Sequence, residues 1–205
     1  MKICRIACLS AALFAISCAD GPATVAVDAT YNLTCPDGNA ADCGSLATPP
    51  PCLSEGADGA SVPGRRSIVG VRGDTACNGD VLDVKCEAIE RPDGRTFIAL
   101  EAYVGDEFAL TLDAILGNGS VEDTCEVTII EDGADYGGMA TGACGTASPS
   151  IDQPCQITNV STEGGAVVFD LECESLLSST SLFGFDVGAV GGGPTRFQFS
   201  SCTGF

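Results

Sequence analysis

The side chains that could do chemistry in this chain are carboxylates and thiols. Its 205 residues include 28 Asp and Glu, 13 Cys and no His. Without histidine, Ser-His-Asp and Cys-His catalysis and the histidine-ligated zinc hydrolases are excluded. Paired carboxylates could still serve glycoside hydrolysis, for which the candidates are Glu122 with Asp123, Glu131 with Asp132, and Glu172 with Glu174. The chain has no Trp and only three Tyr to stack on sugar rings, so solvated acidic faces are favoured over a carboxylate-based hydrolase.

One acidic loop has the residue types of a cation site. The stretch "CPDGNAADCG" carries Asp37, Asn39 and Asp42, whose oxygen atoms are ligands that suit a hard cation such as Ca²⁺. The stretch lacks the full EF-hand pattern, and Asx-rich turns also form without metal. The sequence therefore predicts no cofactor, with calcium bound at this loop as the alternative to a metal-free turn.

The cysteines predict a disulfide framework in an oxidising compartment. Ten of the 13 lie beyond residue 18, an even number, and no CxxC pair or histidine offers zinc-site spacing. We therefore expect up to five disulfides. The ten are Cys35, Cys43, Cys52, Cys77, Cys86, Cys125, Cys144, Cys155, Cys173 and Cys202.

A short internal sequence repeat predicts two of these disulfide pairs. "CEVTIIEDG" and "CQITNVSTEGG" both begin with Cys, then Glu or Gln, a β-branched residue and Thr. In each case a turn follows, and the next cysteine lies on the returning strand of the same hairpin. Its position in the alternating pattern matches that of the residues expected to face the core. The spacing predicts Cys125–Cys144 and Cys155–Cys173, each contributing about 3 kcal/mol in the chain-entropy model. The remaining six cysteines are left unassigned.

The N-terminus is arranged as a bacterial secretory signal. Lys2 and Arg5 precede an uncharged apolar stretch over residues 6–16, followed by small residues. That stretch is shorter than the roughly 20 residues needed to span a bilayer. The chain is therefore expected to be exported.

At "AISC" the sequence resembles a lipobox, the processing site of bacterial lipoprotein precursors. The resemblance covers residues 1–18 only and implies lipid attachment at Cys18, with Ala19 in place of Asp implying the outer membrane. Ala15, where that family prefers Leu, is its departure from the pattern. Ser17 and Ala19 also fit ordinary signal peptidase, with cleavage after Ala19 and a secreted soluble product. Both alternatives leave ten cysteines for pairing.

The charge limits the partners of the mature chain. The formal net charge of −19 becomes −21 when Lys2 and Arg5 are removed with residues 1–17. Such a field repels nucleic acid and anionic lipid surfaces, favours cations or basic partners, and also promotes solubility.

The apolar pattern predicts an all-β, disulfide-rich antiparallel sandwich or barrel-like domain. Beyond residue 65, apolar residues alternate with polar ones in segments separated by turn signals such as "RPDG" and "TEGG". We expect a signal peptide over 1–17, an attachment site, tether and disulfide-tied loop segment over 18–64, and the β domain over 65–205. A short strand is expected within 24–34 at the domain's edge, and residues 174–185 are the only helical candidate. The expected function is a non-catalytic lipoprotein with an envelope or surface-binding role.

Overall fold

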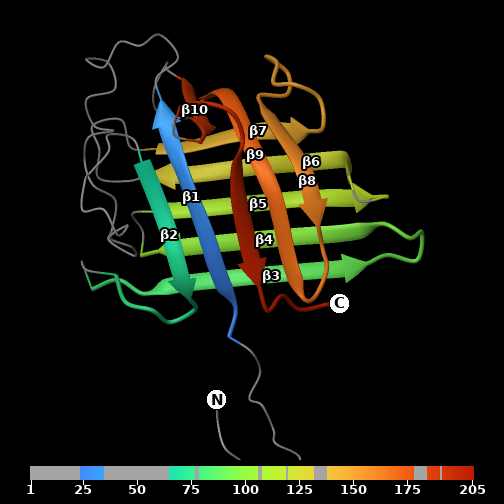
Figure 1. The fold of residues 1–205 in the computed structure, drawn as a ribbon, viewed down its shortest axis with the longest axis horizontal. Helices are drawn as coiled ribbons and strands as arrows, with labels where there is room; N and C mark the ends of the chain where they lie inside the picture. Colours follow the sequence, from blue (N-terminus) through green and yellow to red (C-terminus); the bar gives the residue numbers. More distant parts are fainter. Residues whose placement is uncertain are drawn as a thin grey trace, which may run out of the picture.

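The strands form one continuous series of hydrogen-bonded neighbours that folds over on itself, so that two sheets pack face to face (Figure 1). The computed structural model describes residues 24–34, 65–76, 79–105, 108–118, 120–131, 138–177, 184–189 and 191–205. These residues form strands and turns without a helix, so the predicted all-β fold is confirmed. The strands are β1 (Ala26–Thr34), β2 (Arg65–Val71), β3 (Leu82–Glu90), β4 (Thr96–Val104), β5 (Phe108–Gly117), β6 (Ser120–Glu131), β7 (Gly138–Gly145), β8 (Cys155–Ser161), β9 (Ala166–Leu177), β10 (Gly184–Gly188) and β11 (Thr195–Ser200).

The first sheet, called here sheet one, is a meander of β3 to β7 in chain order. Each neighbouring pair of strands is antiparallel. The β3–β4 turn contains the "RPDG" signal, with Gly94 at a φ of 80° and the Arg91 N–H bonded to the Arg95 carbonyl. This sheet lies behind the other in Figure 1, and its strands run across those of the front sheet at a steep angle.

The second sheet, called sheet two, has the order β2, β1, β10 and β11, β9, β8. Strands β10 and β11 lie end to end in the same slot between β1 and β9. The first half of β1 pairs with β11 and its second half with β10. The two therefore form one strand that is interrupted between Gly188 and Thr195.

The structure corrects the predicted boundary at residue 65. The strand expected within 24–34 exists, but it lies inside sheet two rather than at the domain's edge. Val27, Ala29 and Tyr31 alternate inward and are at most 2% exposed, so this segment supplies core residues. The β domain thus includes residues 24–34 as well as the strands after 65.

The helical expectation for 174–185 is wrong for the residues that the structure describes. Residues 174–177 complete β9, and 184–185 begin β10. Leu176 is buried on the core side of β9, because an irregular register opposite β10 shifts the alternation at Ser175.

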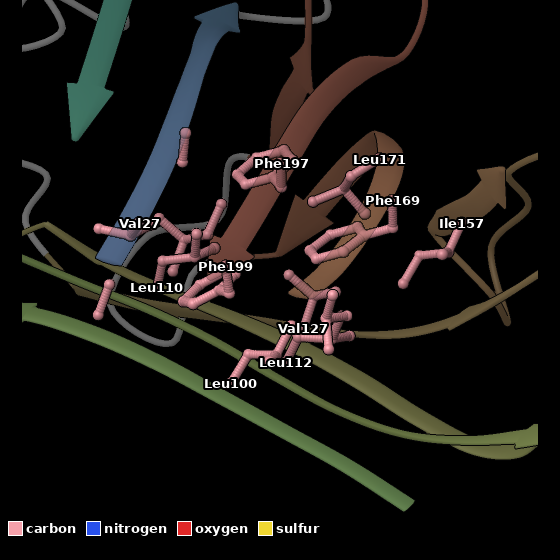
Figure 2. Packing of buried hydrophobic residues seen from close by; sticks show 14 of the residues in the cluster. Val27, Leu100, Leu110, Leu112, Val127, Ile157, Phe169, Leu171, Phe197 and Phe199 are labelled. Carbon is pink, nitrogen blue, oxygen red and sulfur yellow. The ribbon is translucent and has the colours of Figure 1, made fainter. Parts of the chain in front are cut away.

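The core lies between the two sheets and is built from alternating residues of both (Figure 2). Its centre is a short aromatic stack in sheet two. The Phe169 and Phe197 ring centroids lie 5.3 Å apart, and Tyr31 stacks on Phe197 at 5.6 Å. Leucines and valines of sheet one face these rings. Those labelled in Figure 2 are Leu100, Leu110, Leu112 and Val127.

Candidate functional site

Two of the three described disulfides flank the corner where the sheets meet. Cys125–Cys144 joins β6 to β7, and Cys155–Cys173 joins β8 to β9, as the sequence spacing predicts. Between them β7 and β8 run parallel and pair over only two positions, one of which is Cys144 with Cys155. The four cysteines therefore form a row across four strands. The bridges brace a corner that has few backbone hydrogen bonds of its own.

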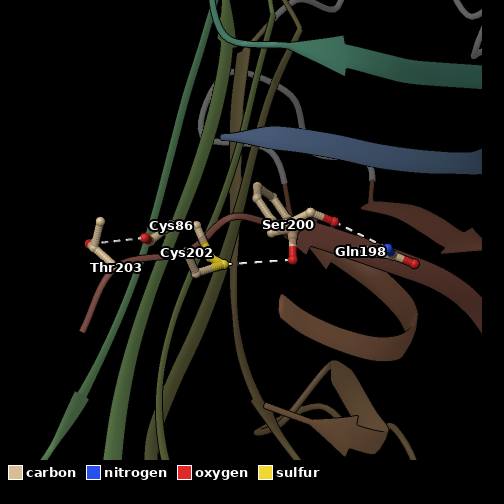
Figure 3. Close-up of a disulfide and its surroundings, with 6 residues drawn as sticks. Cys86, Gln198, Ser200, Cys202 and Thr203 are labelled. Carbon is tan, nitrogen blue, oxygen red and sulfur yellow. Dashed lines mark hydrogen bonds between the residues drawn. A yellow bond between two sulfur atoms is a disulfide. The ribbon is translucent and has the colours of Figure 1, made fainter. Parts of the chain in front are cut away.

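The third disulfide, Cys86–Cys202, attaches the C-terminal segment to β3 (Figure 3). After β11 the chain crosses from sheet two to sheet one. There the Thr203 N–H donates to the Cys86 carbonyl at 3.0 Å, and the Ala88 N–H donates to the Thr203 carbonyl at 2.8 Å. Sequence reasoning left this pair unassigned. The available signal was that Cys86 shares the core-facing phase of β3 with Leu82 and Val84.

Three disulfides in one domain indicate folding in an oxidising, extracytoplasmic compartment. Several sequence predictions fall outside the described residues and stay predictions. They are the attachment site Cys18, the cation loop of Asp37, Asn39 and Asp42, and the pairing of Cys35, Cys43, Cys52 and Cys77.

A cavity of about 270 Å³ opens on the outer face of sheet two, where β10 ends. Its floor is Gly188, which pairs with Asn32 of β1. The loop after β10 folds back over this floor, since a Cβ on Gly188 would lie 2.5 Å from the Gly193 carbonyl oxygen. The loop is closed by hydrogen bonds from the Ala189 N–H to the Gly193 carbonyl and from the Gly192 N–H to the Ala189 carbonyl.

The glycines of this loop are required by its backbone. Gly191, Gly192 and Gly193 have φ values of 94°, 98° and 82°, in the region that L side chains rarely adopt. The sequence predicts a loop before the last strand and excludes a phosphate loop for lack of a Gly-Lys-Ser/Thr ending. In the structure, this glycine loop covers the cavity above Gly188. The spacing of the glycines alone does not predict that position.

Carboxylates line the open side of the cavity. Glu172 and Glu174, one of the predicted carboxylate pairs, both lie here on β9, and Asp186 lies on β10. The Asp186 Oδ1 accepts a hydrogen bond of 2.8 Å from the Ser175 N–H, which fixes the β9 bulge. Ser175 has a φ of 54°, so the carboxylate stabilises an otherwise unfavourable backbone conformation.

Asn32 is the unusual residue of the cavity. It is 8% exposed, and its Oδ1 is buried without a hydrogen-bond partner. Its neighbour Tyr31 faces the core, so Asn32 lies on the opposite, cavity side of β1. Leaving a buried acceptor unpaired costs about 1–3 kcal/mol, so such an atom in a folded protein calls for an explanation.

A second group of charges lies on the outer face of sheet one. The Lys85 Nζ donates to the Glu101 Oε2 at 2.6 Å, and this contact raises the pKa of Lys85. Burial first, and the Glu101 charge second, raise the pKa of Asp113. Burial and then the Glu101 charge likewise raise the pKa of Tyr103. These groups lie on the neighbouring strands β3, β4 and β5 and do not line the cavity near Asn32.

A further cavity of about 540 Å³ lies beside the β7–β8 corner. It is lined by Thr141 and Gly142 of β7, by Pro154, and by the loop that carries Ile151. The Ile151 side chain is fully exposed, at 101%. Its lining also includes Ser150, Asp152, Glu174 and Ser175.

Within the ranges that the structure describes, no three Asp, Glu, His or Cys side chains converge as a preformed metal cluster. The same ranges contain no helix long and apolar enough to cross a membrane. Comparisons of the chain with protein-family models, curated proteins and solved structures found no match.

Proposed function

We propose that this protein is an exported bacterial lipoprotein, held in the outer membrane through acylated Cys18, whose β domain binds a partner and does not catalyse a reaction. The observation that carries the proposal is the sequence "AISC" at the end of a short, uncharged apolar stretch. The disulfides support export, because disulfides form and persist in oxidising compartments outside the cytoplasm.

The position of β1 determines how such an anchor would hold the domain. Strand β1 begins at Ala26, eight residues after Cys18. Eight residues span at most about 30 Å when fully extended. The end of the sandwich at which β1 begins would therefore lie near the bilayer. The cavity near Asn32 lies toward the other end of β1 and would face away from the membrane.

The binding role rests on the residue types available. The chain has no histidine, and the described carboxylates Glu172, Glu174 and Asp186 line one cavity. The formal charge of −21 without residues 1–17 favours cations or basic partners. The alternative is the same domain secreted in soluble form after cleavage following Ala19.

Membrane partitioning of Cys18→Ser tests the proposal. The full chain is expressed in a Gram-negative host, fractionated, and analysed by mass spectrometry of its mature N-terminus. We expect the wild-type protein in the outer membrane with an acylated Cys18, and loss of that attachment in Cys18→Ser. Cys8→Ser, which alters only the signal stretch, is the matched control and should behave as wild type. A soluble wild-type protein that begins at Asp20 would refute the anchor and support the secreted form.

A further inference from the structure

Strand β7 is the last strand of sheet one and lies at the margin opposite β3 (Figure 1). Residues 138–143 of β7 pair with β6 on one side. On the other side β8 pairs only with Cys144 and Gly145. Among the residues that the structure describes, the second edge of residues 138–143 therefore has no strand partner. The backbone N–H and C=O groups of such an edge can pair with another polypeptide.

The opposite margin of sheet one is covered by the chain itself. The C-terminal segment lies along the β3 edge, where the backbone of Thr203 exchanges hydrogen bonds with Cys86 and Ala88. The Cys86–Cys202 disulfide holds the segment there. The backbone of Leu82 likewise bonds to the turn after β2. Covering an edge in this way prevents pairing with other chains, so the β7 edge differs from the β3 edge in being open to a partner.

The cavity of about 540 Å³ lies against this open edge. One of its walls is formed by residues 141–143 of β7, and the other by the loop before β8, which carries Ile151 and Asp152. Glu174 lines it from β9, and the Ile151 side chain beside it is fully exposed. A backbone edge with a cavity alongside is the arrangement that accepts an extended peptide as an added strand.

The side chains of β7 determine which face of an added strand carries charge. A Cβ on Gly142 would lie 2.5 Å from the Leu176 Cδ1, so Gly142 faces the core. Its neighbours Thr141 and Ala143 therefore face outward. Ala143 lies opposite Glu126 of β6, and its small side chain does not cover that carboxylate. A Lys opposite Ala143 on an added strand would lie about 10 Å from β6, a distance that extended Lys and Glu side chains span together.

The cavity adds two carboxylates on the far side of an added strand, those of Asp152 and Glu174. With Glu126, negative groups then flank the strand on both sides. This arrangement favours Lys or Arg at the alternate positions that face outward. A second copy of this chain is disfavoured as the occupant, because each copy carries a strongly negative net charge.

We propose that the β7 edge binds an extended basic segment of a partner protein, which joins sheet one as an additional strand. The main chain of that segment bonds to β7, and its Lys or Arg side chains pair with the flanking carboxylates. This docking role rests on the partner-binding part of the proposed function. It is independent of the lipid anchor, which fractionation of Cys18→Ser tests separately.

Two peptides with identical side chains test the proposal on the oxidised full chain. The first is fluorescein-labelled and alternates Lys with Val over about six residues, the length of a typical strand. The second is the same peptide N-methylated at every amide, which keeps its charges and removes its main-chain donors. We expect the second peptide to bind at least about tenfold more weakly in fluorescence anisotropy, because it cannot donate hydrogen bonds to β7. The first should slow amide exchange within residues 138–143 and leave the central strand β4 unchanged.

Substitutions in the cavity test the role of the carboxylates. Glu174→Gln and Asp152→Asn should each weaken binding of the first peptide by about two- to fivefold, as expected for exposed ion pairs. The matched control is Glu163→Gln, which removes one exposed charge from the turn between β8 and β9 and should bind as the wild type does. All three positions are exposed, so the thermal midpoints should stay equal and show that folding is unaffected.

Several results would overturn the proposal. No binding of the first peptide, or equal binding of both peptides, would exclude pairing with the β7 backbone. Equal losses in Glu163→Gln and Glu174→Gln would indicate attraction to the overall charge. Unchanged amide exchange within residues 138–143 would place the peptide elsewhere. If exchange there slows with rising protein concentration and no peptide, the edge binds a second copy and the basic partner is refuted.

Discussion

Removal of the Cys86–Cys202 disulfide should lower the free energy of unfolding more than removal of Cys125–Cys144 or Cys155–Cys173. The reason is that opening the longer loop returns more conformational entropy to the unfolded chain. The Cys86–Cys202 bridge closes a sequence separation of 116 residues, compared with 19 for Cys125–Cys144 and 18 for Cys155–Cys173. In the chain-entropy model these separations correspond to about 5 kcal/mol for the long loop and about 3 kcal/mol for each short one. The two short bridges lie within the long loop and reduce its effective length. This lowers the stabilisation by Cys86–Cys202 only slightly, because the loop entropy depends on the logarithm of loop length.

The test compares the double variants Cys86→Ala/Cys202→Ala and Cys155→Ala/Cys173→Ala in guanidinium chloride unfolding. Both members of the second pair are fully buried, whereas Cys202 is only half-buried. Loss of packing is therefore no greater for the long bridge, and a larger fall in the free energy of unfolding would reflect its loop. The expected fall is about 4–5 kcal/mol.

A second readout does not depend on packing. The long bridge compacts the denatured chain more, so its removal should raise the denaturant dependence, the m-value, more than removal of Cys155–Cys173. Amide exchange should also accelerate at Ala88 and Thr203, whose hydrogen bonds join the C-terminal segment to β3. Equal m-values in the two double variants, with equal losses of stability, would refute the loop-length argument.

Two further predictions concern the sheets themselves. Phe197 is fully buried and stacks on both Phe169 and Tyr31, so Phe197→Ala should lower the free energy of unfolding by about 3–5 kcal/mol, whereas the exposed Gln198→Ala should change it by less than about 0.5 kcal/mol. Asp113 has a pKa raised above its ordinary 3.8, first by burial and then by Glu101, so its protonated form is favoured in the folded state. Its contribution to stability is therefore present at low pH and is lost as the pH rises through the folded pKa. Asp113→Asn should therefore abolish this loss of stability at rising pH. At neutral pH the free energy of unfolding should be unchanged or raised by less than about 1 kcal/mol. If the pH profile of urea unfolding is the same as in the wild type, the prediction is contradicted.

Sequence reasoning predicted most of sheet one because its signals are local. Each hairpin from β3 to β7 combines period-2 alternation with a turn between neighbouring strands, as at "RPDG". The same locality explains why Cys125–Cys144 and Cys155–Cys173 could be assigned. Each pair lies within one hairpin or next to its end, where strand register determines which residues face each other.

The features that were missed depend on contacts between distant segments. The central position of β1 requires pairing with β10 and β11 near the C-terminus and with β2, which begins at Arg65 although β1 ends at Thr34. The Cys86–Cys202 bridge requires the chain to cross from one sheet to the other. The cavity arises because Gly188 lies opposite Asn32, and a glycine in a short apolar strand carries no signal of what faces it.

The placement of the disulfides follows from how the sandwich is closed. Within sheet one, long antiparallel ladders provide backbone hydrogen bonds, and no described disulfide is needed between β3, β4 and β5. Two bridges flank the β7–β8 corner, where pairing covers only two positions, and the third attaches the C-terminal segment to β3. At both places backbone pairing also joins sheet two to sheet one, through β7 with β8 and through Thr203 with Glu87. Disulfides thus stabilise the connections between the sheets, where backbone hydrogen bonds are few. The cavity on the outer face of sheet two and the unpaired Asn32 Oδ1 lie away from the connection that Cys86–Cys202 stabilises.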